Sequence, residues 1–211
     1  MSKSLGKIYE DHHQASRDRG FSIFAEERGN LLKKNIGKGK NVMDIGCRDG
    51  ALAKYFFQEN NVLGVDIDGS ALNRAKESLG IETIIADLNG DWHELGERKF
   101  DVIVAGEVLE HLYFPEKVLE KVSSHLNNKG IFLGSVPNAF SLKNRIRYLF
   151  AKKENTPLGD PTHINHFSYK ELKNLLQKYF SEVEIIGLGR FKFLSKLMPG
   201  WFAFSLFFKA K

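Results

Sequence analysis

Short apolar runs alternate with stretches of helical periodicity along most of this chain. The runs are bounded by glycine or polar positions, which is the pattern of strands buried in a sheet. Strands are predicted at residues 41–45, 62–65, 82–86, 100–105, 130–136, 182–188 and 202–208. Helices are predicted at residues 21–34, 51–58, 70–78, 115–126 and 168–179, with a short one after Ser141. Residues 1–20 are polar and predict a capping segment.

Particular residues mark the expected helix starts. Ser70 is a suitable N-cap for the helix over 70–78, and Pro115 suits a first helical position. Ser168 with Glu171 three positions later predicts a capping box.

The alternation of strand and helix predicts an α/β fold with a doubly wound, mostly parallel sheet in three α/β/α layers. No helix is expected between the last two strands, so a turn at residues 198–200 should pair them antiparallel. We expect residues 1–36 to form an N-terminal cap and helix, and residues 37–211 to form the main domain. An inserted lid is expected at about residues 137–168, because long irregular segments are often functional.

Composition narrows the class of protein. The chain has 211 residues, 42% hydrophobic and 27% charged, so a globular domain is favoured over disorder. Residues 1–7 are polar with no apolar run behind them, and Cys47 is the only cysteine. A disulfide within the chain and a cysteine-based zinc site are excluded, and we expect a cytoplasmic protein.

Acidic residues follow four successive predicted strands: Asp44, Asp66, Asp87 and Glu107. Ligands of open parallel sheets bind outside the carboxyl ends of the strands. Each acid alone is also typical of a turn. Together they indicate one negatively charged edge, and the spacing of about 20 residues between the first two suits a ribose-binding acid.

The sign of this charge discriminates between cofactors. A pyrophosphate would be repelled, whereas S-adenosylmethionine carries a sulfonium and an ammonium group and no phosphate. The turn after residue 44 has Gly46 and Gly50 but lacks the third glycine of a dinucleotide fingerprint. No P-loop sequence is present either. An NAD-dependent oxidoreductase is therefore disfavoured.

With these features, residues 38–210 resemble the class I S-adenosylmethionine-dependent methyltransferases, which implies a Rossmann-like fold and S-adenosylmethionine as cofactor. The resemblance implies that Gly46 and Cys47 approach the methionine part, and that Asp66 holds the ribose. It implies cofactor contacts for the following set: Asp44, Gly46, Cys47, Gly50, Asp66, Ile67, Asp87, Leu88 and Glu107. In that set Asp87 would bind the adenine amine, with Ile67 and Leu88 packed on the ring. Arg48 departs from the pattern, because many relatives have glycine there.

Catalytic candidates follow the fourth strand and recur in the insertion. His111 is the natural general base, with Glu110 and His163 as further catalytic candidates. The Glu-x-x-Glu-His element resembles that of quinone-pathway O-methyltransferases. With His163 it also resembles the metal site of small-RNA 2′-O-methyltransferases. Three interpretations stay open: no metal with His111 as base, a divalent metal on Glu107, Glu110, His111 and His163, or a purely structural helix cap.

Two further segments bear on the acceptor and on membranes. Basic and aromatic residues mix in a predicted arm: Lys143, Arg145, Arg147, Tyr148, Phe150, Lys152 and Lys153. The arm favours an anionic acceptor or is a solvated helix packed on the core. The aromatic tail has no run of ~20 apolar residues, so no transmembrane segment is predicted. It is expected to be a buried strand, or a peripheral membrane contact through Leu197, Met198, Trp201 and Phe202.

The sequence therefore predicts an S-adenosylmethionine-dependent methyltransferase that O-methylates a small molecule, a glycan or a lipid-linked acceptor, with anionic acceptors among the candidates. Two alternatives remain: a metal-dependent RNA 2′-O-methyltransferase, and a non-catalytic S-adenosylmethionine-binding module, which only Arg48 supports.

Overall fold

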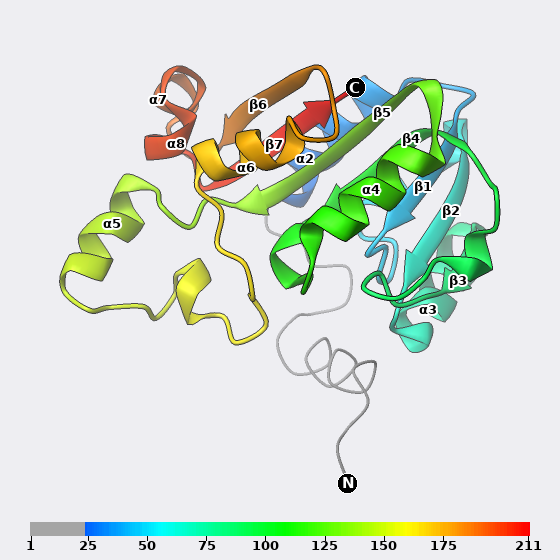
Figure 1. The fold of residues 1–211 in the computed structure, drawn as a ribbon, viewed down its shortest axis with the longest axis horizontal. Helices are drawn as coiled ribbons and strands as arrows, with labels where there is room; N and C mark the ends of the chain where they lie inside the picture. The colour runs from blue at the N-terminus through cyan, green and yellow to red at the C-terminus, as the bar shows by residue number, and fades with distance from the viewer. Residues whose placement is uncertain (1–23) are drawn as a thin grey trace, which may run out of the picture. The chain divides into compact units, whose positions relative to one another are not determined.

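The computed structural model describes residues 24–211, so the predicted capping segment and the start of the helix expected from residue 21 lie outside the described residues. The strands are β1 (Asn41–Ile45), β2 (Asn61–Asp66), β3 (Glu82–Ile85), β4 (Phe100–Gly106), β5 (Leu126–Pro137), β6 (Val183–Leu188) and β7 (Ser205–Ala210) (Figure 1). The helices are α2 (Ala25–Ile36), α3 (Gly69–Leu79), α4 (Pro115–His125), α5 (Leu142–Leu149), α6 (Tyr169–Leu176), α7 (Lys192–Leu197) and α8 (Pro199–Phe202). Short 3₁₀ turns are η1 (Ala53–Tyr55), η2 (Phe57–Glu59), η3 (His93–Leu95), η4 (Leu109–His111) and η5 (Pro157–Gly159).

The strands hydrogen-bond in the order β3-β2-β1-β4-β5-β7-β6. β2 pairs in parallel with both β1 and β3, whereas β7 runs antiparallel to both β5 and β6. The predicted α/β class is confirmed: the sheet is mostly parallel, its C-terminal strands are antiparallel, and helices flank it.

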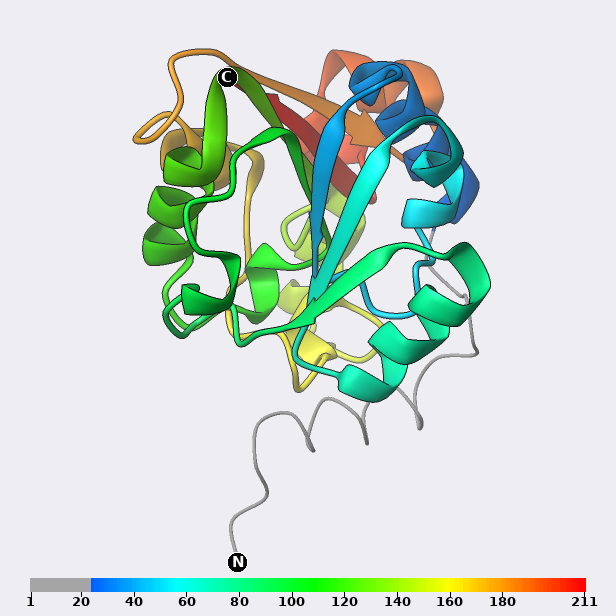
Figure 2. The same ribbon diagram turned by 90° about the vertical axis from the view of Figure 1, so that its right-hand side faces the viewer.

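The chain divides into two compact units. Of the described residues, the first unit comprises 24–104 and His125–Gly130, and the second comprises Ala105–Ser124 and Ile131–Lys211. In the first unit, α3 packs against β2 and β3 (Figure 2). In the second unit, α6, α7 and α8 pack against β6.

Each unit has its own apolar core. In the first, Val42, Met43 and Ile45 of β1 are fully buried, which explains why this strand is an almost continuous apolar run. In the second, the ring of Phe132 lies 5.0 Å from that of Phe208 and 5.7 Å from that of Phe180, centroid to centroid. Such aromatic pairs stabilise a core beyond the area they bury.

The predicted N-terminal cap of α6 is confirmed, and the predicted cap of α3 is wrong. The capping box of α6 is present: the Ser168 hydroxyl accepts from the Glu171 N–H, and the Glu171 carboxylate accepts from the Ser168 N–H. Ser70, by contrast, is not the N-cap of α3. The helix begins at Gly69 because the carboxylate of Asp68 accepts from the Ala71 N–H.

Two predicted elements differ from those observed. The helix expected over 51–58 is the pair of 3₁₀ turns η1 and η2, separated at Phe56, whose φ of −133° is not helical. The turn expected at 198–200 is replaced by α7 and α8, so only Ser205–Ala210 of the tail is a strand. Both segments are rich in apolar residues, so their sequences show no clear periodicity that would separate a helix from a strand. No helix within residues 24–211 has both the length and the hydropathy needed to cross a membrane.

Candidate active site

The turn that follows β1 depends on two glycines. The N–H groups of Gly46 and Cys47 both donate to the carbonyl of Val65, over 2.8 and 3.1 Å. Gly46 and Gly50 have φ of 70° and 79°, in the left-handed region that favours glycine. A Cβ on Gly50 would also lie 2.5 Å from the Cδ1 of Leu79. Both predicted glycines are therefore required by the local backbone.

Arg48 occupies the same turn with a φ of 51°, which costs a non-glycine residue on the order of 1 kcal/mol. Its N–H donates to Oδ2 of Asp66 over 2.8 Å, and its Nε lies 3.0 Å from Oδ1 of Asp49. These charge-assisted bonds offset the backbone strain, so arginine is compatible with this turn.

Asp44, Cys47 and Asp66 form a buried acidic group in the first unit. Burial raises the pKa of Asp44 to about 7; the hydrogen bond from Cys47 lowers it, and the charge of Asp66 raises it further. Burial likewise raises the pKa of the Cys47 thiol well above its usual value. Gly64 makes room for this thiol, since a Cβ there would lie 2.8 Å from the sulfur. Two close, buried carboxylates fit a positively charged ligand, because a cation relieves their mutual repulsion.

Local hydrogen bonds orient three acids of the first unit, Asp66, Asp68 and Asp87. Oδ1 of Asp66 accepts from the Asp68 N–H over 2.9 Å, so backbone donors fix its orientation, while Asp68 caps α3. Oδ1 of Asp87 accepts from the Asn89 N–H over 2.9 Å and closes a turn. Leu88 is buried and Ile67 half-buried. Every residue between Asp44 and Leu88 that was predicted to bind the cofactor thus belongs to this unit.

Glu107, the first residue after β4, belongs to the second unit. Its φ is 59°, an unusual value for a non-glycine residue. Its N–H donates to the Ser135 carbonyl over 2.9 Å, and its Oε1 accepts from the Ser205 hydroxyl over 3.1 Å. Contacts to β5 and β7 thus hold this residue where the chain turns into η4.

A segment of the predicted lid is bound directly to η4. The N–H groups of Ile164 and Asn165 both donate to the carbonyl of Glu110 over 2.9 Å. The Asn165 amide also donates to the carbonyl of Leu112. Sequence reasoning missed Asn165, and no local signal would have found it, because these contacts join residues more than 50 positions apart.

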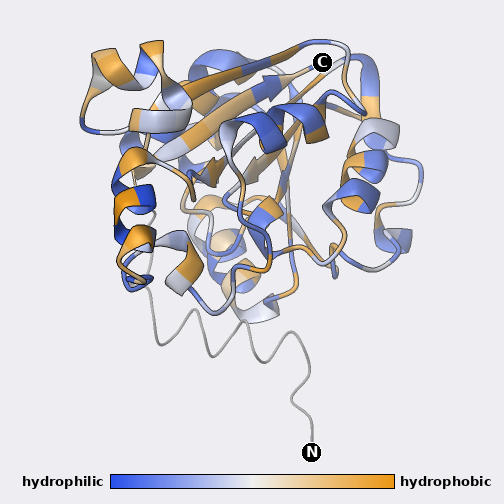
Figure 3. Ribbon diagram, turned by 60° about the vertical axis from the view of Figure 1, so that its left-hand side comes forward, coloured by the Kyte–Doolittle hydropathy of each residue, from blue (hydrophilic) through white to orange (hydrophobic). Residues whose placement is uncertain are grey.

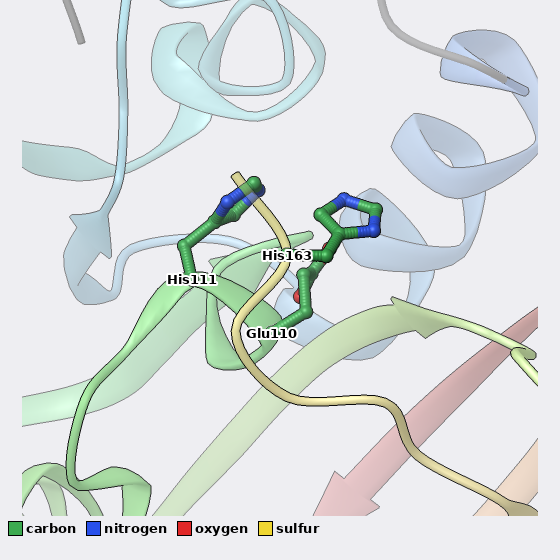
Figure 4. A group of neighbouring side chains, drawn as sticks. All are labelled: Glu110, His111 and His163. Carbon is green, nitrogen blue, oxygen red and sulfur yellow. The ribbon is translucent and has the colours of Figure 1, made fainter. Parts of the chain in front are cut away.

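A turn within this segment brings two histidines together. Oδ1 of Asp160 accepts from both the N–H and the hydroxyl of Thr162, over 2.9 and 2.7 Å. The Thr162 carbonyl then lies 2.9 Å from Nδ1 of His111. The imidazoles of His111 and His163 lie edge to face, with centroids 4.9 Å apart (Figure 4). The Asp160-Pro161-Thr162 sequence was the available signal for this turn.

Hydrogen bonding fixes the tautomers of both rings. A carbonyl oxygen only accepts, so Nδ1 of His111 carries the proton and its Nε2 presents a lone pair when the ring is neutral. Nδ1 of His163 lies 3.1 Å from the Pro157 carbonyl, which implies the same tautomer. Burial lowers the pKa of His163, whereas Asp160, whose Oδ2 lies 3.7 Å from Nε2, acts in the opposite direction. In its neutral form, either ring can accept a proton or bind a metal through Nε2.

Ligand atoms of Glu110, His111 and His163 all lie within 4.8 Å of one another (Figure 4). Glu110 is buried, and the two histidines are half-buried. One carboxylate and two imidazoles are a donor set that divalent transition metals accept. Within residues 24–211, Glu107 is not grouped with these three ligand atoms. The geometry thus groups three of the four predicted metal-binding residues.

The predicted basic arm is α5 and the residues after it. Ser141 caps the helix, accepting from the Asn144 N–H. Arg145 donates to the Phe140 carbonyl and Arg147 to that of Glu154, so these two guanidinium groups also support the local backbone. Phe150 is 70% exposed and does not pack on a core.

Comparisons with known proteins identify the family of this chain. A family model described as "Methyltransferase domain" matches residues 17–179. The Ribosomal protein L11 methyltransferase of Clostridium botulinum is 32% identical over 108 residues, covering 49% of this chain and 34% of that protein. The Ubiquinone biosynthesis O-methyltransferase of Haemophilus ducreyi is 30% identical over 109 residues, covering 47% of this chain and 46% of that protein. This chain therefore spans less than half the length of either relative.

Among solved structures, a SAM dependent methyltransferase from Archaeoglobus fulgidus has a similar fold. The TM-score is 0.66 with 18% sequence identity, and the match covers 99% of this chain and all of that one. The name of one sequence relative refers to ribosomal protein L11 and that of the other to ubiquinone biosynthesis, so these names leave the acceptor of this chain open.

Proposed function

As a member of the methyltransferase-domain family, this chain is an S-adenosylmethionine-dependent methyltransferase, and we propose that its acceptor is a hydroxyl group. The proposed acceptor is a small molecule, a glycan or a lipid-linked compound. The observation that carries this proposal is the hydrogen bond between Nδ1 of His111 and the Thr162 carbonyl, which leaves Nε2 as a proton acceptor.

The proposed chemistry needs one base. S-adenosylmethionine supplies a methyl group that is already electrophilic, so a hydroxyl acceptor mainly requires orientation and loss of its proton. Nε2 of His111 would accept that proton, and bound S-adenosylmethionine would supply the methyl group and keep the sulfur as a neutral thioether. General-base help of this kind contributes about 10²–10⁴-fold to the rate.

We assign cofactor binding to the buried acids of the first unit. Asp66, whose carboxylate is oriented by two backbone N–H groups, would bind the ribose hydroxyls. The Asp44 carboxylate would act by its charge on the cationic ligand. Gly46, Cys47 and Gly50 would line the methionine part, Glu107 would also contact the cofactor, and Asp87, Ile67 and Leu88 would surround the adenine.

A transfer screen tests the hydroxyl assignment. The protein is incubated with S-adenosylmethionine labelled in the methyl group and with fractionated metabolites, lipids and RNA, with and without a chelator. Mass spectrometry of the labelled product then locates the methyl group. A methyl ether formed equally with and without chelator supports the proposal, whereas a methylated amine or carbon would contradict it.

A second function, metal-dependent 2′-O-methylation of RNA, is favoured by one observation. Glu110, His111 and His163 bring three ligand atoms within 4.8 Å, and α5 adds exposed basic residues for a phosphate backbone. In that case His111 would be a metal ligand and not the base. Labelled RNA that appears only without chelator, and that is restored by added metal, would select this function.

A further inference from the structure

We propose that α5, α7 and α8 form a docking surface for the interface of an anionic lipid bilayer. These helices belong to one unit, and α8 contacts both α5 and α7. The guanidinium carbon of Arg145, on α5, lies 5.0 Å from the ring centroid of Trp201, on α8. The three helices, with residues 150–153 after α5 and 189–191 before α7, are called the docking face below.

The docking face exposes large apolar side chains. Leu149 is 83% exposed, Phe193 75% and Phe150 70%, values that are unusual for residues of this type. The exposed apolar residues of the face are Ile146, Leu149, Phe150, Phe191, Phe193, Leu194, Leu197, Met198 and Trp201. The ribbon coloured by hydropathy shows hydrophobic positions mixed with hydrophilic ones along the helices (Figure 3). Contiguous exposed apolar surface indicates a protein or membrane contact.

The charge of the docking face is positive. Its exposed basic residues are Lys143, Arg145, Lys152, Lys153, Arg190 and Lys196. No acidic residue occurs in residues 141–153 or 189–204. Basic side chains beside apolar and aromatic ones are the combination that binds anionic lipid headgroups while burying apolar groups at the acyl boundary.

The same charge argues against a second copy of this chain as the occupant. Two copies meeting through this face would bring like charges together, which is unfavourable. An anionic membrane surface complements both the charge and the apolar side chains. α7 has six residues and α8 four, so both are too short to span a bilayer and would lie in its interface.

Intrinsic fluorescence offers a direct test of bilayer binding. The chain has two tryptophans, and Trp92 is buried in the first unit, so a vesicle-induced change reports mainly on Trp201. Vesicles of phosphatidylcholine with phosphatidylglycerol, and vesicles of phosphatidylcholine alone, are titrated into the full chain, with co-sedimentation as the second readout. A blue shift and co-sedimentation with the anionic vesicles, weakened by salt, are expected.

Two double variants with matched controls assign the binding to the docking face. Phe193→Ser with Leu197→Ser should weaken partitioning by about tenfold or more, whereas Ile85→Ser, an exposed apolar residue of the first unit, should not. Lys152→Glu with Lys153→Glu should weaken it similarly, whereas Lys76→Glu with Lys129→Glu should have little effect.

Three results would overturn the proposal. They are no binding to either vesicle, equal binding by the test and control variants, and self-association in solution that Phe193→Ser with Leu197→Ser abolishes. The readout is vesicle binding and not methyl transfer, so the result is independent of which acceptor is methylated.

Discussion

His111 donates its Nδ1 proton to the carbonyl oxygen of Thr162, 2.9 Å away, although 51 residues separate the two in the chain. This bond orients the imidazole and selects the tautomer in which Nε2 accepts. The carbonyl is itself held by the turn that Asp160 forms with Thr162. The segment around Thr162 therefore positions the proposed base.

Removal of the Asn165 side chain tests how far that segment depends on its attachment to η4. Asn165→Ala deletes the amide donor to the Leu112 carbonyl, so the free energy of unfolding should fall by about 1–3 kcal/mol. Turnover should fall more than cofactor affinity. Chemical denaturation and calorimetry measure the two effects.

The exposed Asn73 of α3 provides the control, because Asn73→Ala should change stability by less than about 0.5 kcal/mol. Equal stability and turnover in the Asn165 and Asn73 variants would show that the amide does not hold the segment.

The elevated pKa of Asp44 predicts a pH-dependent affinity for S-adenosylmethionine. With a pKa of about 7, roughly a tenth of the carboxyl is ionised at pH 6 and nine-tenths at pH 8. A cationic ligand favours the ionised form, so affinity should rise with pH, by up to about tenfold across this range.

Asp44→Asn should lose this dependence. Calorimetry on both proteins at each pH gives the ratio of their affinities, which cancels titration of the ligand's own amino group. A ratio that stays constant from pH 6 to pH 8 would refute the electrostatic role of Asp44.

Asp66→Ala should weaken cofactor binding by about 1–3 kcal/mol, through loss of charge-assisted bonds to the ribose. S-adenosylhomocysteine carries the same ribose, so its affinity should fall by a similar factor. Asp91→Ala, at an exposed acid of the same unit, should leave both affinities unchanged. Selective loss for only one of the two ligands would argue against the ribose assignment.

The close approach of Gly64 to Cys47 predicts a coupled effect on stability. Gly64→Ala places a Cβ 2.8 Å from the Cys47 sulfur and should cost about 1–3 kcal/mol. Cys47→Ala in the same chain should recover part of that cost, because the sulfur is gone. A double-mutant cycle of unfolding free energies measures the coupling, and strictly additive effects would exclude the contact.

The sequence predicts features whose partner residues are near one another in the chain better than features whose partners are far apart. The capping box of Ser168 and Glu171 was predictable because both partners lie within one turn. Asp68 and Ser70 are both suitable caps two positions apart, and composition alone could not choose between them. The grouping of His163 with His111 was expected from the family resemblance, and the turn at residues 160–162 had a local signal. The backbone bond from Asn165 to Glu110 had none, because its partners lie far apart in the chain.

The most direct measurement is a single-turnover methyl-transfer rate for His111→Ala with saturating S-adenosylmethionine and the acceptor found in the transfer screen. The rate should fall by about 10²–10⁴-fold while the cofactor dissociation constant stays within about twofold of the unsubstituted protein. An undiminished rate would contradict the role of His111 as the base that accepts the hydroxyl proton.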